Sequence, residues 1–309
     1  IADFQNPHNI CGYVGENKGE HIDSPISTPL PLLPENFEVE DWEKLPLPIQ
    51  YICCSHRRMM QAAHWNEDNY RHYVPAFQHY TRIVARQIES VLEALYSTPA
   101  GKNTIVIVLA DHGDGMGSHR MVTKQVSFYE EMTNVPFIIA GPGIHPRQKP
   151  VEDLLTQPTI DLLPTLCERA GIPVPSSKPG ISLAPFLKGE KQKRQHPYAA
   201  SEWHSEYEVT VSPGRMIRSP RYKYTHYLEG NGEELYDMLK DKGERRNLAH
   251  DPKYSKILAE HRALLDDYIR RTQDDYRSLK VEADKRWRSH APGYPNHEGP
   301  CARDIINRK

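Results

Sequence analysis

The stretch from Thr104 to Lys124 constrains the fold more than any other part of the chain. It opens with a continuous aliphatic and β-branched run over residues 105–109 and then passes into the Asp-His-Gly-Asp sequence of residues 111–114. Such a run predicts a central parallel strand that is covered on both faces. Because ligands of open α/β sheets bind outside the carboxyl ends of the strands, we expect the residues after Leu109 to face a functional site.

This loop gathers groups that bind cations and anions. Asp111 offers a hard oxygen ligand, and His112 offers a second ligand or a hydrogen-bond donor. The glycines allow the backbone to approach a tetrahedral oxyanion closely, and Lys124 adds a mobile positive charge. Asp114 is better suited to hold the loop by accepting backbone amide protons, as in an Asx turn, than to bind a metal.

Around this loop the sequence resembles the type I sulfatases of the alkaline phosphatase superfamily. The resemblance continues in order through residues 128–143, 159–166, 215–224 and 234–237. Upstream, Asn6-Pro7-His8 is similar to the family's Pro-His segment, which brings a histidine to the sulfate. In all, the likeness spans roughly residues 1–275.

The resemblance implies an α/β fold with a mostly parallel central sheet flanked by helices, as in alkaline phosphatase. A smaller antiparallel sheet plus a helix should follow towards the C-terminus. We therefore expect residues 1–197 to be the C-terminal portion of a catalytic α/β domain. Residues 198–309 should form a smaller α+β subdomain with a polar tail.

The resemblance also implies a sulfuric ester hydrolase that acts on sulfated carbohydrates, with roles for five residues. Asp111 and His112 would bind Ca²⁺, while Lys124 and His8 would bind the sulfate and take part in catalysis. His119 would contact the substrate from the rim of the site. Lys124 follows Asp111 by 13 positions, which matches one branch of the family. An imidazole such as that of His8 can protonate a leaving alkoxide near neutral pH.

Each of these residue types also occurs without such a role. An aspartate after a strand often caps the next helix, and a lone lysine is usually a solvated surface charge. His119 could simply pack in the interior, and Pro-His dipeptides are common in turns. The assignments above therefore depend on the family resemblance.

Two family features are absent from the sequence. Such sulfatases oxidise a Cys or Ser in a Cys/Ser-x-Pro/Ala-x-Arg motif to formylglycine, and they hold calcium with a further pair of aspartates near the N-terminus. None of the five cysteines fits that motif, and the chain begins with Ile1 next to the Pro-His segment. We therefore expect an N-terminally truncated chain that is inactive alone and whose partner is the missing segment of the same enzyme. The five cysteines are Cys11, Cys53, Cys54, Cys167 and Cys301.

The composition limits the kinds of partner that the chain could bind. With 39 basic and 41 acidic residues the net charge is −2, so no global field favours nucleic acid or an anionic membrane. No apolar run approaches the ~20 residues that span a bilayer, and no signal peptide is visible. The location stays unknown from the residues, whereas the family resemblance implies a periplasmic, secreted or lysosomal protein.

Two other functions remain open. One is a phosphodiesterase or phosphonate hydrolase of the same superfamily, with a Thr or Ser nucleophile on the missing segment. The other is a non-catalytic fragment that binds anions or glycans. The sequence does not distinguish the sugar, the sulfate position or the oligomeric state.

Periodicity predicts the main elements. We expect a helix over 66–96 that packs on the sheet, a buried strand over 135–140, and a helix over 157–170 whose leucines face the core. Antiparallel strands should follow from residue 198, covered by a helix over 251–271 that Asp251-Pro252 begins. Residues 9–50 should be irregular, and the tail over 286–309 should wrap the surface or be partly mobile.

Overall fold

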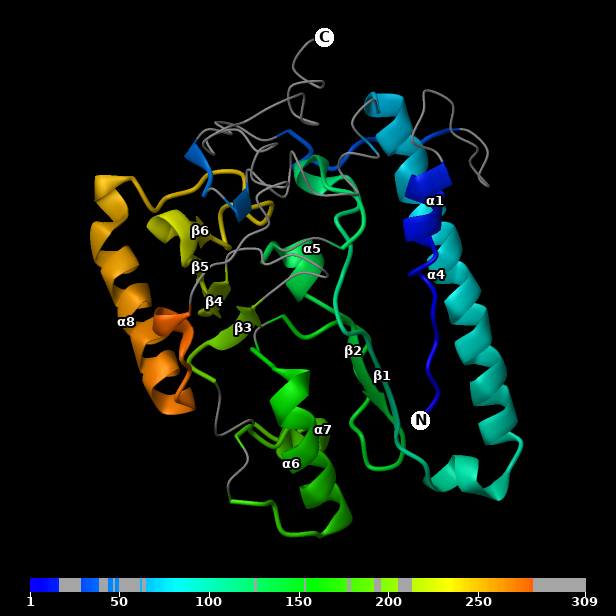
Figure 1. Cartoon of the computed structure of the whole chain (residues 1–309). Helices are drawn as coiled ribbons and strands as arrows, with labels where there is room; N and C mark the ends of the chain where they lie inside the picture. Colours follow the sequence, from blue (N-terminus) through cyan, green and yellow to red (C-terminus); the bar gives the residue numbers. More distant parts are fainter. Residues whose placement is uncertain are drawn as a thin grey trace.

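The computed structural model describes most of the chain, and its described strands form a two-stranded sheet and a four-stranded sheet (Figure 1). The predictions about the tail over 286–309 and about Cys53, Cys54 and Cys301 lie outside the described residues. No helix in the described ranges is long and apolar enough to cross a membrane. Those ranges are 1–16, 29–38, 44–46, 48–49, 62, 65–124, 127–152, 154–176, 179–191, 196–204 and 213–279.

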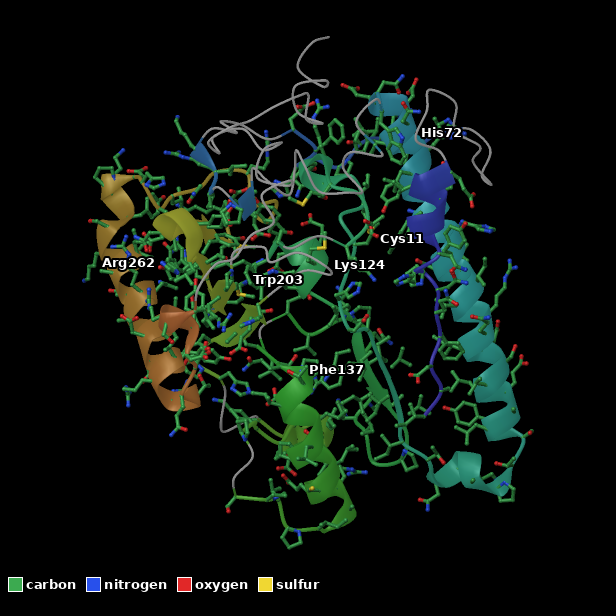
Figure 2. The ribbon with its side chains drawn as sticks, viewed as in Figure 1. Cys11, His72, Lys124, Phe137, Trp203 and Arg262 are labelled. Carbon is green, nitrogen blue, oxygen red and sulfur yellow. The ribbon has the colours of Figure 1, made fainter. Side chains whose placement is uncertain are left out.

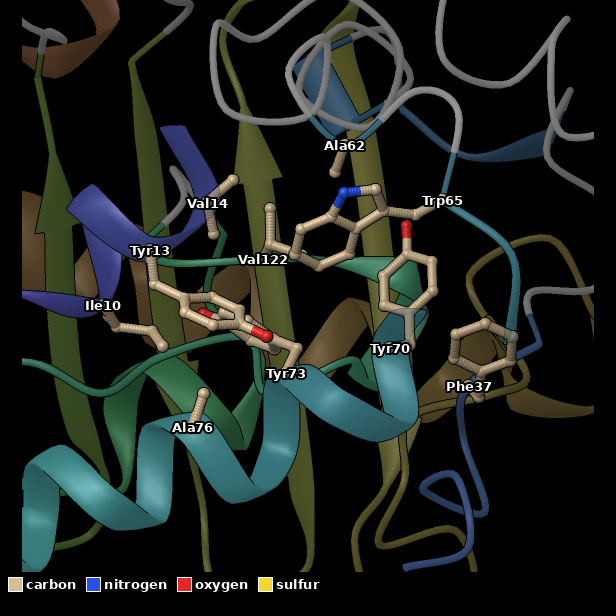
Figure 3. Packing of buried hydrophobic residues seen from close by; sticks show 10 residues of the cluster. All are labelled: Ile10, Tyr13, Val14, Phe37, Ala62, Trp65, Tyr70, Tyr73, Ala76 and Val122. Carbon is tan, nitrogen blue, oxygen red and sulfur yellow. The ribbon is translucent and has the colours of Figure 1, made fainter. Parts of the chain in front are cut away.

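The predicted long helix is confirmed as α4, Glu67–Tyr96. It begins with a capping box in which the side chains of Asn66 and Asn69 each accept a hydrogen bond from the other's backbone N–H. Only its first three turns are buried, and they pack with α1, Ile10–Glu16, in an aromatic cluster rather than on the sheet (Figure 3). The helix α1 falls inside the stretch that we expected to be irregular. Its apolar face packs against the buried start of α4.

The strand after Thr104 is β1, Val106–Leu109, and its partner is β2, Phe137–Ala140. The two pair antiparallel, with Val106 opposite Ala140. The expected parallel sheet is therefore not confirmed, and coverage on both faces is wrong for the described residues, where Leu109 is 47% and Ile138 is 58% exposed. An apolar run encodes the tendency to form a strand but not the direction of its neighbour.

The predicted helix over 157–170 is α6, Pro158–Ala170, and it is followed by the short α7, Ala184–Leu187. The expectation that its three leucines face the core is wrong for Leu163 and Leu166, which are 42% and 41% exposed, whereas Leu162 is half-buried. Instead, the buried carboxylate of Asp161 anchors the opposite face. It accepts hydrogen bonds from the backbone N–H groups of Gln157 and Ile181, and it pairs with the His196 imidazole at 2.7 Å.

The C-terminal antiparallel sheet is confirmed, in the order β3-β4-β5-β6. Its helix, α8, covers one face with Leu258 and Leu265, and Asp251 caps the preceding turn at Pro252–Tyr254. The other face packs on Phe128, Tyr129 and Met132 around the short helix α5. Figure 1 shows α5 between this sheet and the β1–β2 pair. The bounds are α5 Glu130–Thr133, β3 Ala199–Trp203, β4 Gly214–Arg218, β5 Tyr222–Tyr227, β6 Gly232–Asp237 and α8 Ser255–Thr272.

Candidate functional site

The loop over residues 111–124 leaves the end of β1 and folds back on the start of α5. Gly113 donates its N–H to the carbonyl of Met132, and Asp114 donates its N–H to that of Glu131. A Cβ atom at Gly113 would lie 1.7 Å from the Glu131 carbonyl oxygen, so only glycine fits there. This glycine is therefore required by packing inside the protein, a reason that differs from the approach to an oxyanion that we expected.

At the end of β1 the carboxylate of Asp111 lies near the imidazole of His112, and each group can offer a lone pair. The His112 Nδ1 atom lies 2.8 Å from the carbonyl oxygen of Gly113. Because a carbonyl can only accept, Nδ1 carries the proton, and in a neutral ring Nε2 then keeps its lone pair. That Nε2 lies 3.6 Å from Oδ2 of Asp111. The two atoms can form an ion pair if the ring is protonated, or they can share a cation.

This pair fits one side of a cation site but does not complete a calcium site. Ca²⁺ takes about six to eight oxygen ligands, whereas the pair offers one carboxylate and one imidazole. Among the residues that the structure describes, no group of three or more His, Cys, Asp or Glu side chains could hold a metal ion. Asp111 is well placed to contribute, because its side chain is 88% exposed.

Lys124 and His8 lie together although 116 positions separate them. The Nζ atom of Lys124, a residue labelled in Figure 2, is 3.2 Å from Nδ1 of His8. His8 precedes α1 in the sequence. A lysine ammonium has donors only, so Nδ1 of His8 accepts and its Nε2 carries the proton. Both groups are exposed. The pair therefore presents an ammonium and an imidazole N–H, which suits an oxyanion.

Asp114 holds the loop between the two pairs. Its Oδ1 accepts a hydrogen bond from the N–H of Met116 at 2.9 Å, which confirms the expected role in holding the loop. Burial raises the pKa of Asp114 to about 6, while hydrogen bonds and the charges of His112 and Lys124 oppose the rise. One residue of each pair therefore acts on the Asp114 carboxylate.

His119 lies in the interior rather than at the rim where we expected it. It is 2% exposed and stacks on Tyr129 with ring centroids 3.9 Å apart and an interplanar angle of 10°. Burial lowers the pKa of His119 to about 4. A buried neutral imidazole supports the loop, so this position does not favour the predicted contact with substrate.

A buried ionic network supports α5 from the C-terminal sheet. The ammonium of Lys223, 1% exposed, donates to the Phe128 carbonyl at 2.8 Å and lies 2.8 Å and 2.9 Å from the carboxylates of Glu130 and Glu244. The Glu244 carboxylate also accepts the N–H of Glu130. The sequence analysis did not identify Lys223, because no local pattern distinguishes a buried lysine on a strand from a lysine that is exposed to solvent.

Comparisons with known proteins identify the family to which the chain is similar. A family model described as N-sulphoglucosamine sulphohydrolase, C-terminal, matches residues 117–271, and the sulfatase model matches residues 46–172. Over all of its 309 residues the chain is 75% identical to the Delta 4,5-hexuronate-2-O-sulfatase of Bacteroides thetaiotaomicron, of which it covers 64%.

Two solved structures extend the comparison. A structure described as a 2-O GAG sulfatase matches with a TM-score of 0.91 and 76% identity, over 99% of this chain and 66% of that one. A phosphonate monoester hydrolase of Agrobacterium radiobacter matches with a TM-score of 0.57 and 25% identity, over 66% of this chain and 42% of that one. The chain thus spans just under two thirds of the length of the two sulfatases.

Proposed function

The chain belongs to the sulfatase family, and from this membership we propose that it supplies one wall of the active site of a sulfuric ester hydrolase. The observation that supports the proposal most directly is the contact between Lys124 and His8. The chain brings these two residues together from positions 116 apart, and Lys124 lies on the loop that also carries the carboxylate–imidazole pair of Asp111 and His112. Sulfate monoesters are anions, and this wall offers them positive and proton-donating groups.

In the reaction, a nucleophile forms a bond to sulfur, the bond between sulfur and the ester oxygen breaks, and the alcohol leaves as an alkoxide that needs a proton. We assign that proton to Nε2 of His8, whose Nδ1 then takes a proton from the Lys124 ammonium, so that the ring stays neutral. Until that transfer, Lys124 also places positive charge next to the sulfuryl oxygens, and this charge stabilises the anion. Overall one water molecule is consumed: its hydroxide equivalent leaves with the sulfate, and its proton returns to Lys124 through His8.

Sulfatases of this family use calcium and formylglycine. We propose that Asp111 and His112 would hold one side of the calcium ion. When bound, the ion would polarise the sulfuryl oxygens. The remaining ligands and the formylglycine would come from residues other than those that the structure describes. His119 is better assigned to support of the loop than to contact with the substrate.

We propose a sulfated carbohydrate as substrate, with sulfate on O2 of a hexuronate as the first compound to test. This choice is based on the relatives, whose names give a hexuronate-2-O-sulfatase and a 2-O GAG sulfatase. The phosphonate hydrolase is far less similar, at 25% identity, so sulfate is favoured over phosphonate. A periplasmic, secreted or lysosomal location fits such a substrate.

The test compares two proteins. One is this chain alone, and the other is this chain fused to the part of the Bacteroides relative that it does not cover. We expect the fusion to release sulfate from a 2-O-sulfated unsaturated hexuronate disaccharide. The chain alone should hydrolyse no aryl sulfate above background, since its described residues complete neither a metal site nor a nucleophile.

Phosphate and phosphonate monoesters serve as competing substrates in the same assay. A fusion that prefers them over the sulfate ester would contradict the proposal. Turnover by the chain alone, after removal of contaminating sulfatases, would contradict the expected need for further residues.

A further inference from the structure

One buried hydroxyl of α4 connects both ends of the loop. Tyr73 is fully buried, and its hydroxyl donates to Oδ1 of Asp114 at 2.7 Å. The Tyr73 hydroxyl oxygen in turn accepts the backbone N–H of Thr123, also at 2.7 Å. Asp114 lies two residues after His112, and Thr123 lies directly before Lys124. A single phenol therefore joins the segment that carries Asp111 and His112 to the segment that carries Lys124.

Thr123 has a backbone conformation that its own chemistry does not favour. Its φ of +57° lies in the left-handed region, which is unusual for a β-branched residue. Its side-chain Oγ1 is buried and has no hydrogen-bond partner among the described residues. Two hydrogen bonds hold the backbone of Thr123. Its N–H donates to the Tyr73 hydroxyl, and its carbonyl accepts the N–H of Gly115 at 2.9 Å. Strain of this kind persists where the surroundings enforce it.

The surroundings of Tyr73 make this contact rigid. Its ring packs in the aromatic cluster with Trp65, Tyr13 and Val122, and Figure 3 shows it on the buried face of α4. Burial raises the pKa of Tyr73 well above its ordinary value, so the hydroxyl keeps its proton and remains a donor. The packed helix thereby fixes a point from which both loop segments are held.

We propose that Tyr73 and Thr123 are positioning residues that fix the Lys124 ammonium beside His8 and at a set distance from Asp111 and His112. The proposal rests on the proposed function, because it takes Lys124 and His8 as the sulfate-binding pair. Tyr73 acts through hydrogen bonds to the loop and Thr123 through its strained backbone. Neither residue is assigned a contact with the substrate.

The experiment uses the full chain, with inorganic sulfate as the probe and the NMR signals of the His8 imidazole as a second measurement. Tyr73→Phe keeps the ring and removes the hydroxyl, and we expect sulfate affinity to fall about tenfold. Thr123→Gly removes the strain and the unpaired hydroxyl, so its Tm should stay or rise while sulfate affinity falls. Both variants should shift the His8 signals, because Lys124 is no longer held beside that ring.

Tyr70→Phe is the matched control. Tyr70 lies one turn earlier on α4, is equally buried, and donates its hydroxyl to the Arg120 carbonyl at 3.1 Å. Its loss should lower the Tm but leave sulfate affinity and the His8 signals unchanged. A loss of affinity that simply followed Tm across all three variants would indicate a general structural effect and overturn the proposal.

The outcomes separate this proposal from the proposed function. Wild-type affinity and unchanged His8 signals in Tyr73→Phe and Thr123→Gly would overturn the positioning role alone. If the wild-type chain itself binds no sulfate, the sulfate-binding role fails, and the His8 signals then decide the positioning. Signals that change only in the two variants would support it, and identical signals in all four proteins would refute it.

Discussion

The buried imidazole of His119 makes the stability of this chain depend on pH in a defined direction. Burial lowers the pKa of His119 from 6.5 to about 4. Between these values the unfolded chain binds a proton at this position and the folded chain does not. The free energy of unfolding is therefore not reduced by His119 above pH 6.5. It falls as the pH drops from 6.5 towards 4, because protonation of His119 favours the unfolded chain.

The size of the effect follows from the same pKa. At about 1.4 kcal/mol for each pKa unit, the whole window corresponds to about 3 kcal/mol, and a change from about pH 7.5 to about pH 5 corresponds to about 2 kcal/mol. We choose His119→Asn as the perturbation, because asparagine tolerates the φ of +51° at this position. The variant loses the stacking on Tyr129, which is worth about 1 kcal/mol, and it loses the proton linkage.

The assay is denaturant unfolding of both proteins at the two pH values. On acidification the wild type should lose about 2 kcal/mol more than His119→Asn, so the gap between them should close or reverse. His250→Asn, at an exposed histidine, controls for the substitution and should keep the wild-type dependence. Equal pH dependence in wild type and His119→Asn would refute the reasoning, as would an NMR titration of His119 near pH 6.5.

Four further predictions concern the site and its support. In the fusion enzyme, Lys124→Ala should raise KM and lower kcat, since Lys124 holds the sulfate until its proton is transferred. His8→Ala should lower mainly kcat, by about 10²–10⁴-fold. The loss should be smallest for nitrophenyl sulfate, because its leaving group is already acidic. An equal loss of kcat on nitrophenyl sulfate and on a sugar sulfate would argue against proton donation by His8. Gly113→Ala should lower the free energy of unfolding, measured in urea, by more than about 3 kcal/mol, because the added Cβ would meet the Glu131 carbonyl. Gly12→Ala is the control and should be tolerated, because the nearest atom to its added Cβ is 4.0 Å away. Lys223→Met should cost about 3 kcal/mol in that assay by breaking a buried ionic network, and Lys240→Met, at an exposed lysine, should not.

Periodicity and local chemistry predicted the elements whose stability is largely local. The spacing of apolar residues gave α4, α6 and α8, and Asp251-Pro252 marked the turn before α8. The motif also predicted residues that meet in space, because Lys124 and His8 lie 3.2 Å apart. That contact agrees with the sulfate-binding assignment, which stays a prediction until binding is measured.

Other features could not be predicted because they depend on partners distant in sequence. The pairing of β1 with β2 is antiparallel, and no residue in either strand encodes that direction. Leu163 and Leu166 match a helical stripe, yet the face anchored by Asp161 is the buried one. Tyr73 fits an apolar position in α4, but the sequence does not predict that its hydroxyl bonds to Asp114 and Thr123, which lie 41 and 50 positions away.

Backbone strain distinguishes this loop from the rest of the described chain. Four of the seven non-glycine residues with positive φ lie inside it, within the eight positions from 116 to 123: Met116, His119, Arg120 and Thr123. Each such residue costs about 1–3 kcal/mol unless its surroundings compensate. The compensation is visible at two of them, in the stacking of His119 on Tyr129 and in the bond from Thr123 to the Tyr73 hydroxyl. A loop required only to connect β1 to α5 would gain nothing from this strain. Under the proposed function, a loop that holds Asp111, His112 and Lys124 in fixed relation gains preorganised charge, which is the main way in which an active site stabilises an anionic transition state.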